Sequence, residues 1–305
     1  TDAGGNKDIA NVTVNVHGAN EKPLINVSQF WTQIGNDIDG EAVNDRSGNS
    51  IALSSDGSVI AIGAKGNDGN GPSRYYTNYG HVRIYQNDNG TWTQIGTDID
   101  GESANDFSSA SISLSDDGEV VAIGSTHGNG LVQVYAIDNF GDWIQIGEDI
   151  LGKSQESFGS SVELSEDGST LAVGSLGGGN NGYGTTRIYK NINSVWTEIG
   201  QGIHSEPNYR NYDRYNSVQL SGDGSILAVG FQYDVNDDVL PRGVVKLYEN
   251  KNNQWVQIAN DINGDLEGDF LGNSLSLSLD GATLAAGSHL NFRTSSLLDS
   301  HNSYI

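Results

Sequence analysis

The chain has 305 residues, of which 39 are Asp or Glu and only 15 are Lys or Arg, so its formal net charge is -24. Such a chain repels the phosphates of nucleic acids and the headgroups of acidic membranes, and neither is an expected partner. Cysteine is absent, which excludes disulfides, thiolate metal sites and cysteine nucleophiles. No apolar run approaches the ~18 residues of a membrane-spanning helix, so membrane insertion is not expected either.

The first 23 residues form a segment of their own. The run Asp8-Ile-Ala-Asn-Val-Thr-Val-Asn-Val16 alternates as a strand does, and Gly18-Ala-Asn-Glu-Lys-Pro23 follows it. This segment resembles the last strand and exit linker of a cadherin-like bacterial adhesin repeat, with Glu21 in place of the usual Asp. The resemblance implies that residues 1–23 are the tail of such a repeat and that residues 24–305 form a second domain.

Beyond residue 23 the dominant feature is a set of repeated phrases. One reads Trp-x-Gln/Glu-Ile-Gly/Ala and recurs every 51 to 61 residues, at Trp31, Trp92, Trp143, Trp196 and Trp255. A second, Leu-Ser-x-Asp-Gly, ends at Gly57, Gly118, Gly168, Gly224 and Gly281. A third closes four units at Tyr85, Tyr135, Tyr189 and Tyr248. Repetition on this scale predicts one supersecondary unit per repeat.

Each phrase is typical of a strand. Ser50-Ile-Ala-Leu-Ser54 alternates with period two, and Ile60-Ala-Ile-Gly63 is nearly all small or apolar, as in a strand buried on both faces. The Asp-Gly pair between them predicts a two-residue hairpin turn with positive φ at both residues. Four antiparallel strands per repeat predict an all-β protein, a β-propeller of four-stranded blades. Five units are visible. Either the Trp31 strand closes a short ring or, as we expect, further blades beyond residue 305 make about seven.

The combined phrases resemble a known repeat. Asp-x-Phe-Gly-x-Ser-Val-x-Leu-Ser-x-Asp-Gly, with the Ala-Val-Gly and Val-x-Ile-Tyr strands that follow, is similar to the FG-GAP repeat of integrin α-subunit propellers. It is closer still to repeats of large secreted proteins from marine microbes. Phe158-Gly159 carries the name motif, which weakens to Ser47-Gly48, Phe107-Ser108 and Leu271-Gly272. The resemblance covers residues 27–288 and implies an extracellular or cell-surface location.

The loops between the second and third strands vary most in length: 64–80, 125–130, 175–184, 231–243 and 288–301. Variable loops on a rigid ring tend to carry binding, and in a propeller they share a face with the connections between blades. The candidate residues for binding a glycan or protein ligand are Arg74, Tyr75, Tyr76, Tyr79 and Tyr183. The alternative is that these tyrosines pack the loops onto their neighbours.

The connections between blades carry carboxylates at positions 1, 3, 5 and 9, a spacing of oxygen ligands found in many Ca²⁺ loops. The candidate calcium ligands are Asp37, Asp39, Glu41 and Asp45, then Asp98, Asp100, Glu102 and Asp106, and then Asp261, Asn263, Asp265 and Asp269. The integrin-type calcium hairpin is shortened here to Ser-x-Asp-Gly, so we expect that family site to be lost. The alternative for these loops is a set of Asp-capped turns on a solvated acidic face.

Signatures of catalysis are not found. The six histidines occupy unrelated repeat positions and are expected at surfaces or turns: His17, His81, His127, His204, His289 and His301. No nucleophile elbow or phosphate-binding loop is present. We therefore expect no enzyme but a non-catalytic extracellular recognition or adhesion module that binds glycan or protein through its variable acidic face. The alternative is a building block that self-assembles in a cell-surface filament or matrix. A propeller hydrolase would need an inward-facing acid pair of raised pKa.

Overall fold

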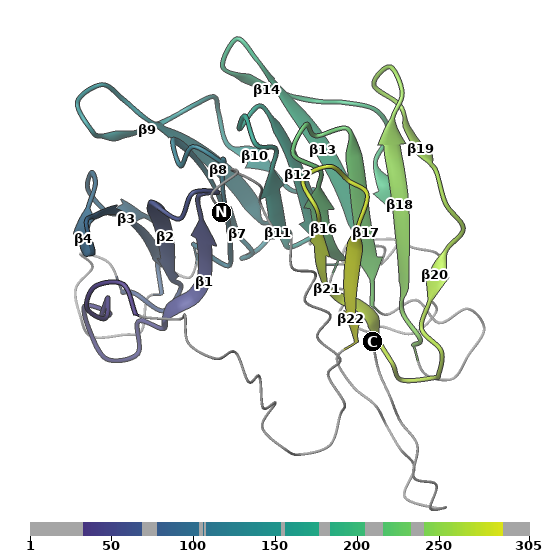
Figure 1. Cartoon of the computed structure of the whole chain (residues 1–305), viewed down its shortest axis with the longest axis horizontal. Coiled ribbons are helices and arrows are strands. Elements are labelled where there is room, and N and C mark those ends of the chain that lie inside the picture. The colour runs from purple at the N-terminus through teal and green to yellow at the C-terminus, as the bar shows by residue number, and fades with distance from the viewer. Residues whose placement is uncertain are drawn as a thin grey trace, which may run out of the picture. The chain divides into compact units, whose positions relative to one another are not determined.

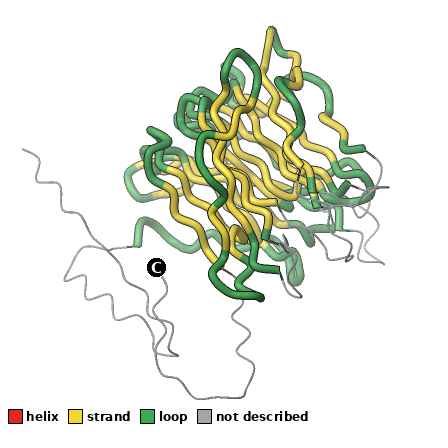
Figure 2. The backbone as a smooth tube through the Cα atoms, turned by 90° about the vertical axis from the view of Figure 1, so that its right-hand side faces the viewer, coloured by secondary structure: helices red, strands yellow, loops and turns green. Residues whose placement is uncertain are grey.

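The computed structural model describes residues 33–68, 78–103, 106, 108–153, 156–176, 184–204, 216–232 and 241–288. The chain falls into two units, and residues 34–292 form one of them. The described elements are strands joined by loops and turns (Figure 2), and no helix among them has the length and apolar character of a membrane span. The predicted adhesin tail, residues 1–23, lies outside the described residues, and so does Trp31.

The strands form five sheets, numbered here as blades 1 to 5 in chain order (Figure 1). Blade 1 contains β1 (Ser47–Leu53), β2 (Val59–Ala64), β3 (His81–Asp88), β4 (Thr91–Gln94) and β5 (Ile99–Asp100). Blade 2 contains β6 (Ser111–Leu114), β7 (Val120–Ser125), β8 (Leu131–Ile137), β9 (Trp143–Gln145) and β10 (Ile150–Leu151). Blade 3 contains β11 (Phe158–Leu164), β12 (Thr170–Ser175), β13 (Thr185–Ile192), β14 (Val195–Glu198) and β15 (Ile203–His204). Blade 4 contains β16 (Asn216–Leu220), β17 (Ile226–Phe231), β18 (Val244–Asn250), β19 (Trp255–Gln257) and β20 (Ile262–Asn263), and blade 5 contains β21 (Leu271–Leu277) and β22 (Leu284–Ser288).

Blades 1 to 4 share one antiparallel topology. In blade 3, β11 pairs with β12, β12 with β13, and β13 with both β14 and β15. The last two strands pair with opposite ends of β13, so together they make one interrupted outer strand. The interruption falls at the repeated Ile-Gly step, where Gly96 and Gly147 have φ of 71° and 83°. Each of these blades is therefore four strands wide, which confirms the predicted all-β propeller architecture; the number of blades in a full ring stays a prediction.

Successive blades are joined by backbone hydrogen bonds at the inner turns. The second residue of each Ser-x-Asp-Gly turn donates its amide to the carbonyl of the same residue in the next blade. The four bonds are Ser55 to Asp116 (3.0 Å), Asp116 to Glu166 (3.0 Å), Glu166 to Gly222 (2.8 Å) and Gly222 to Leu279 (2.8 Å). Since backbone groups make these bonds, the side chain at this position is free to vary, as the sequence shows.

The Ser-x-Asp-Gly turns do not form the predicted two-residue hairpin. In the first turn only Gly57 has positive φ, at 73°. Asp56 Oδ1 instead accepts hydrogen bonds from Ser54 Oγ at 2.9 Å and from the amide of Ser58 at 2.8 Å. The prediction is wrong because the serine and aspartate side chains supply their own hydrogen bonds and so stabilise a wider loop.

Positive φ at both turn residues occurs in the outer hairpins instead. Between β3 and β4, Asn89 and Gly90 have φ of 51° and 90°, and between β13 and β14, Asn193 and Ser194 have φ of 53° and 63°. Consecutive residues of positive φ are the signature of the tight turn that matches strand twist. The predicted turn type is therefore present, two hairpins further along the chain.

The Phe-Gly motif marks a corner at the start of the innermost strands of blades 1, 2, 3 and 5. Gly48, Gly159 and Gly272 have φ of 83°, 85° and 90°, and in blade 2 the matching residue is Ser109, with φ of 70°. The motif in blade 2 is thus Ser108-Ser109, one residue later than the sequence suggested. Phe158 itself is fully buried, at 0% exposure.

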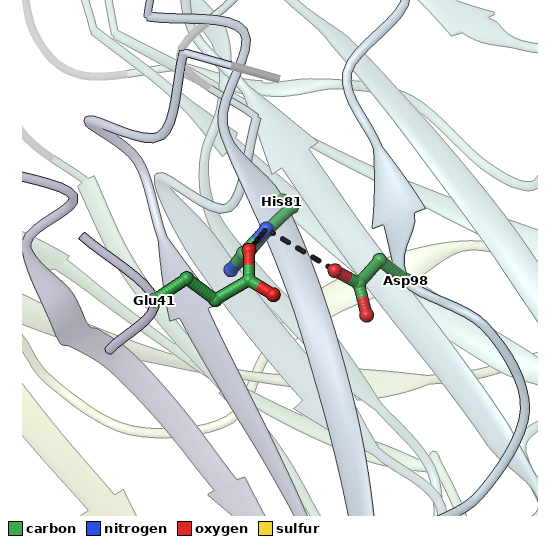
Figure 3. A group of neighbouring side chains, drawn as sticks. All are labelled: Glu41, His81 and Asp98. Carbon is green, nitrogen blue, oxygen red and sulfur yellow. Dashed lines mark ion pairs between the residues drawn. The ribbon is translucent and has the colours of Figure 1, made fainter. Parts of the chain in front are cut away.

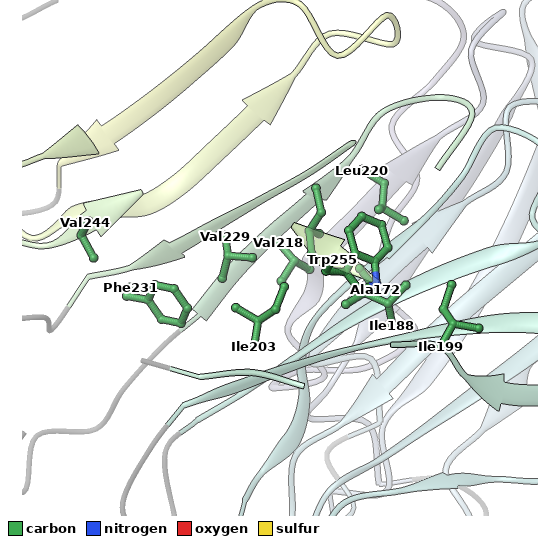
Figure 4. Close-up of a cluster of buried hydrophobic side chains, with 11 residues drawn as sticks. Ala172, Ile188, Ile199, Ile203, Val218, Leu220, Val229, Phe231, Val244 and Trp255 are labelled. Carbon is green, nitrogen blue, oxygen red and sulfur yellow. The ribbon is translucent and has the colours of Figure 1, made fainter. Parts of the chain in front are cut away.

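The hydrophobic core lies between adjacent blades. The cluster between blades 3 and 4 combines Ile188 of β13 with Val218 of β16, Val229 of β17 and Trp255 of β19 (Figure 4). Two further clusters join blades 1 and 2 and blades 2 and 3. Burying one such side chain stabilises the fold by roughly 1.5–3 kcal/mol. Packing between blades therefore fixes the spacing of the innermost strands, which line the centre.

Candidate functional site

A cavity of about 480 Å³ lies along the innermost strands β1, β6, β11 and β16. Its wall carries hydroxyl groups of Ser50, Ser111 and Ser161 between small apolar side chains. Glu163 is the one ionisable side chain among the described lining residues. Such a lining suits an uncharged molecule rich in hydroxyl groups and places a single carboxyl group beside it.

Glu163 occupies a fixed position of the repeat, the third residue of the phrase Ser-x-x-Leu. The matching residues of the five innermost strands are Ala52, Ser113, Glu163, Gln219 and Ser276. In the register of each blade, this residue lies opposite an alanine of the second strand, as Glu163 lies opposite Ala172. Charge at this position is therefore particular to blade 3 among the described blades. Sequence reasoning missed it, although aligning the repeats with each other would have found it.

The neighbouring blades hold the Glu163 carboxyl group from both sides. Ser113 of blade 2 and Gln219 of blade 4 both hydrogen-bond to it. The Ser113 hydroxyl also accepts a hydrogen bond from the amide of Leu164 at 2.9 Å, which leaves its proton for the carboxyl group. The side chain is partly exposed to the cavity, but the packed strands around it remove most of its hydration.

This environment favours the neutral form of the acid. Burial raises the pKa of Glu163 to about 8, against the opposing effect of the hydrogen bonds from Ser113 and Gln219. A carboxyl group with such a pKa holds its proton at neutral pH and can donate it to a bound molecule. The cavity thus contains a carboxyl group that can donate a proton at neutral pH, whereas an exposed carboxylate would already have lost its proton at that pH.

The predicted calcium ligands fall into different local arrangements. Asp45, Asp106 and Asp269 each accept a hydrogen bond from the amide three residues earlier, at 2.8, 2.6 and 2.7 Å. Asp45 and Asp269 are also buried, each at 5% exposure. These three carboxylates hold turns, in the manner of the alternative that the sequence left open.

A second group is oriented by the glutamine of the Trp-x-Gln-Ile-Gly phrase. Asp98 Oδ1 accepts from Gln94 Nε2 at 2.7 Å, and Asp261 Oδ1 accepts from Gln257 Nε2 at 2.7 Å. Lys246 lies 3.5 Å from Asp261 Oδ2. The position of each aspartate therefore depends on its own blade.

The remaining predicted ligands are exposed: Asp37, Asp39, Asp100, Glu102, Asn263 and Asp265. Asp37 and Asp39 line a hollow of about 340 Å³ beside Trp92. Glu102 accepts a hydrogen bond from Gln133 at 3.0 Å. The structure does not gather the four carboxylates of one loop around a common point.

It brings one carboxylate from each of two loops to His81 instead. His81 Nδ1 lies 3.8 Å from Glu41 Oε2 and 3.7 Å from Asp98 Oδ2 (Figure 3). These three side chains could hold a metal ion, and they are the one such group among the described residues. The prediction that His81 is a surface or turn residue is wrong: it begins β3 and is 1% exposed, because antiparallel pairing places it inside the blade next to β5.

Of the predicted ligand-binding residues, only Tyr79 is described. Its carbonyl accepts a hydrogen bond from the amide of Ser108 at 3.0 Å, which ties the first variable loop to the connection between blades 1 and 2. The loop and the connection therefore share a face, as predicted. Arg74, Tyr75, Tyr76 and Tyr183 lie outside the described residues, and their role stays a prediction.

Comparison with known proteins gives a likeness of structure without one of sequence. No family model and no curated protein matches the sequence. Among solved structures, the periplasmic gluconolactonase of Pseudomonas aeruginosa matches with a TM-score of 0.51 and 17% identity, over 78% of this chain and 64% of that one. A Bacteroides uniformis protein described as a 6-phosphogluconolactonase matches with a TM-score of 0.53 and 13% identity, over 80% of this chain and 64% of that one.

These neighbours correct the functional expectation. The chain spans about 64% of the length of each lactonase that it resembles. At 13–17% identity the likeness establishes the propeller fold, and it supports neither the FG-GAP nor the cadherin-like assignment. Because both neighbours are enzymes, the predictions of a non-catalytic adhesion module, of a structural building block and of an absence of enzymatic activity are wrong. Those predictions relied on the absence of known catalytic motifs from the sequence.

Proposed function

We propose that the protein hydrolyses an uncharged sugar lactone in the cavity along β1, β6, β11 and β16, with Glu163 as the catalytic acid. The observation that carries this proposal is the position of the Glu163 carboxyl group, which lies in the cavity wall between Ser113 and Gln219. The lactonases of similar fold support the same reaction class.

Hydrolysis of a lactone needs a proton at one defined atom. Water adds to the carbonyl carbon, the bond from that carbon to the ring oxygen breaks, and the ring oxygen leaves as a hydroxyl group. The protonated Glu163 would supply the proton to the ring oxygen, and the proton lost by the attacking water returns to the carboxylate directly or through solvent. General acid catalysis of this kind contributes typically 10²–10⁴-fold to a rate.

The lining favours an uncharged substrate. Ser50 and Ser111 donate their hydroxyl protons to the carbonyls of Ser109 and Gly159, both at 2.7 Å, so their oxygens can accept hydrogen bonds from the hydroxyls of a lactone. Neither lysine nor arginine is found among the described lining residues, and the chain as a whole carries a net charge of -24. A phosphorylated lactone would meet repulsion without a compensating cation, so we infer that a neutral lactone is preferred.

The test is the hydrolysis of glucono-δ-lactone by the purified chain at mildly acidic pH, where spontaneous opening is slow. We expect acceleration over buffer, a loss of roughly 100-fold in Glu163→Gln, and an unchanged rate in Glu148→Gln, the same substitution at an exposed position of blade 2. A wild-type rate equal to that of buffer would refute the proposed function. Full activity in Glu163→Gln would refute the role of this residue.

Calcium, the ion predicted from the loop spacing, stays a proposal for the acidic connections. Its support is the exposure of Asp37, Asp39 and Asp100 on neighbouring loops. Thermal unfolding in EDTA and then in millimolar Ca²⁺ tests it, since an ion bound only by the folded state raises the melting temperature. An unchanged melt would contradict calcium binding.

We also propose that the protein acts outside the cytoplasm and that its blades are of the FG-GAP type. The first proposal is supported by the periplasmic description of one structural neighbour. The second is supported by the buried Phe158 and by the positive φ of Gly159 at the corner that the motif marks. Detection of the protein in the periplasmic or secreted fraction of its host tests the first, and detection only in the cytoplasm contradicts it.

A further inference from the structure

The residue at the position of His81, the first residue of β3, differs in chemical type from its counterparts in the other blades. His81 pairs across the sheet with Asp100, at the junction of β3 and β5. The matching third-strand residues are Leu131, Thr185 and Val244 in blades 2, 3 and 4. Among the described blades, only blade 1 therefore places a buried imidazole beside the carboxylates of the acidic connections.

In the other blades, a donor two residues further along the same strand contacts those carboxylates. Gln133 Nε2 donates to Glu102 and to Asp149, both at 3.0 Å. Arg187 donates to both oxygens of Glu156, at 2.7 and 2.9 Å. In blades 2 and 3, a glutamine or an arginine side chain therefore donates hydrogen bonds to these carboxylates.

Blade 1 arranges its corresponding donor differently. Arg83 Nη2 donates to the carbonyl of Asp39 at 2.7 Å, and its Nη1 lies 3.8 Å from Glu41 Oε1. Arg83 therefore faces Oε1 of Glu41, whereas Oε2 faces His81. Gln94 Nε2 donates a hydrogen bond to Oδ1 of Asp98 at 2.7 Å. Each carboxylate has one oxygen engaged by a neighbour, and its other oxygen points to His81 (Figure 3).

The gaps that remain have the size of a metal site. The Nδ1–Oε2 and Nδ1–Oδ2 distances of 3.8 and 3.7 Å exceed hydrogen-bonding distance. Metal bonds of about 2.1 Å in tetrahedral geometry would place ligand atoms roughly 3.4 Å apart. The imidazole side chain is 2% exposed, so it cannot turn to water without opening the blade.

We propose that Glu41, His81 and Asp98 bind a divalent ion of the zinc type, which fastens the first acidic connection to the outer edge of blade 1. The imidazole nitrogen decides the class of ion, because nitrogen ligands suit zinc and its transition-metal neighbours, whereas calcium is bound by six to eight oxygens. Gln94 orients the Asp98 carboxylate by a hydrogen bond, as outer partners do in metal sites, and Arg83 forms an ion pair with Glu41 at 3.8 Å. The site is separate from the cavity that contains Glu163.

The experiment is titration of the metal-free 305-residue chain with Co²⁺, followed by its visible absorption, and then displacement by Zn²⁺. We expect one saturable site with the absorption of a nitrogen- and oxygen-bound cobalt ion and a raised melting temperature. His81→Leu, which installs the residue of blade 2, should fold and lose the signal, and Asp98→Asn at the partly exposed edge should weaken it. His127→Ala, at an exposed histidine, should bind as the wild type does.

Three results would overturn the proposal. One is the absence of saturable Co²⁺ or Zn²⁺ binding to the wild-type chain, which would leave the three residues without a metal role. Another is undiminished binding in both His81→Leu and Asp98→Asn, which would place the ion elsewhere. Stabilisation by Ca²⁺ but not by Zn²⁺ would equally exclude the assigned ion class. None of these readouts depends on lactone hydrolysis.

Discussion

Trp143 of blade 2 donates its indole N–H to the carbonyl of Ile95 in blade 1, at 3.1 Å. Trp196 makes the same bond to Ile146 at 2.9 Å, one blade further on. At Trp92, Trp143 and Trp196 the repeated Trp-x-Gln-Ile-Gly phrase thus makes a contact between successive copies, in which the tryptophan of one copy hydrogen-bonds to the isoleucine carbonyl of the copy before it. This explains why the phrase recurs even though the tryptophans are not all fully buried. The indole N–H of Trp255 has no hydrogen-bond partner among the described residues.

A side chain at Gly96, the glycine of this phrase in blade 1, should destabilise the fold. Gly96 has φ of 71°, and a Cβ atom there would lie 2.7 Å from Cδ1 of Trp143. We expect Gly96→Ala to destabilise the fold by about 1–2 kcal/mol for the backbone conformation and by about 1–3 kcal/mol more for the steric clash. Gly128→Ala, at φ of 63° with nothing within 4 Å of the added Cβ, isolates the backbone cost. Urea unfolding of both variants measures the difference, and equal losses would contradict the packing argument.

The ion pair of Arg187 and Glu156 should be costly to break from one side. Both residues are buried, at 4% and 9% exposure, and the Arg187 guanidinium also lies 5.2 Å from the ring centroid of Phe158. Arg187→Met leaves a buried carboxylate without its partner, so we expect a loss of about 3–5 kcal/mol. The double variant Arg187→Met, Glu156→Gln should recover part of that loss in urea unfolding. Additive losses in the double variant would show that the two groups are not coupled.

Much of the fold could be predicted because the same strand and turn phrases occur several times in the sequence. Five copies of Ser-x-Asp-Gly and five tryptophans determine the blade, its strand order and its width. The turn geometry could not be predicted from the Asp-Gly pair alone, since the hydrogen bonds from Ser54 and Ser58 to Asp56 decide it. A local dipeptide preference of this kind is overridden by side chains two residues away.

The aspartates of the inner turns should make the fold sensitive to acid. Hydrogen bonds from Ser225 and Ser221 hold the pKa of Asp223 below its ordinary value of 3.8. The stabilisation is therefore fully present above about pH 4 and is lost as the pH falls through the lowered pKa. We expect Asp223→Asn to be less stable than the wild type at neutral pH and nearly equal to it near pH 2. Melting temperatures across that range test the prediction, with the exposed Asp142→Asn as control.

Glu163 should have the opposite pH dependence. Its folded pKa of about 8 lies above the ordinary value of 4.5, so its protonated form is compatible with the fold below about pH 4.5 and stability is lost as the pH rises toward 8. Glu163→Gln keeps a neutral side chain of the same shape at every pH. We expect the variant to match the wild type near pH 4.5 and to exceed it above pH 8 by on the order of a few kcal/mol. Parallel unfolding curves at all pH values would show that Glu163 is ionised in the folded protein.

The two candidate sites differ in how far the sequence could reveal them. The acidic spacing singled out Glu41 and Asp98 and assigned them to separate calcium loops, whereas the structure places both beside His81. Their approach to His81 depends on pairing between β3 and β5 that no local pattern encodes. Glu163 was visible as the one charged residue in its repeat column, yet its pKa is raised by burial among three blades, against the opposing hydrogen bonds from Ser113 and Gln219. The repeated phrases identify the residues that all blades share, whereas each candidate site contains a residue, Glu163 or His81, that differs from its counterparts in the other blades.

The pH dependence of lactone hydrolysis tests the central claim most directly. If the protonated Glu163 is the acid, kcat for glucono-δ-lactone, corrected for spontaneous hydrolysis, should fall as the pH rises through about 8, the value to which burial in the cavity wall raises the pKa of Glu163. That fall should be missing from the residual activity of Glu163→Gln. A wild-type rate that rises through the same range, or a profile shared by wild type and Glu163→Gln, would contradict the assignment of Glu163 as the acid.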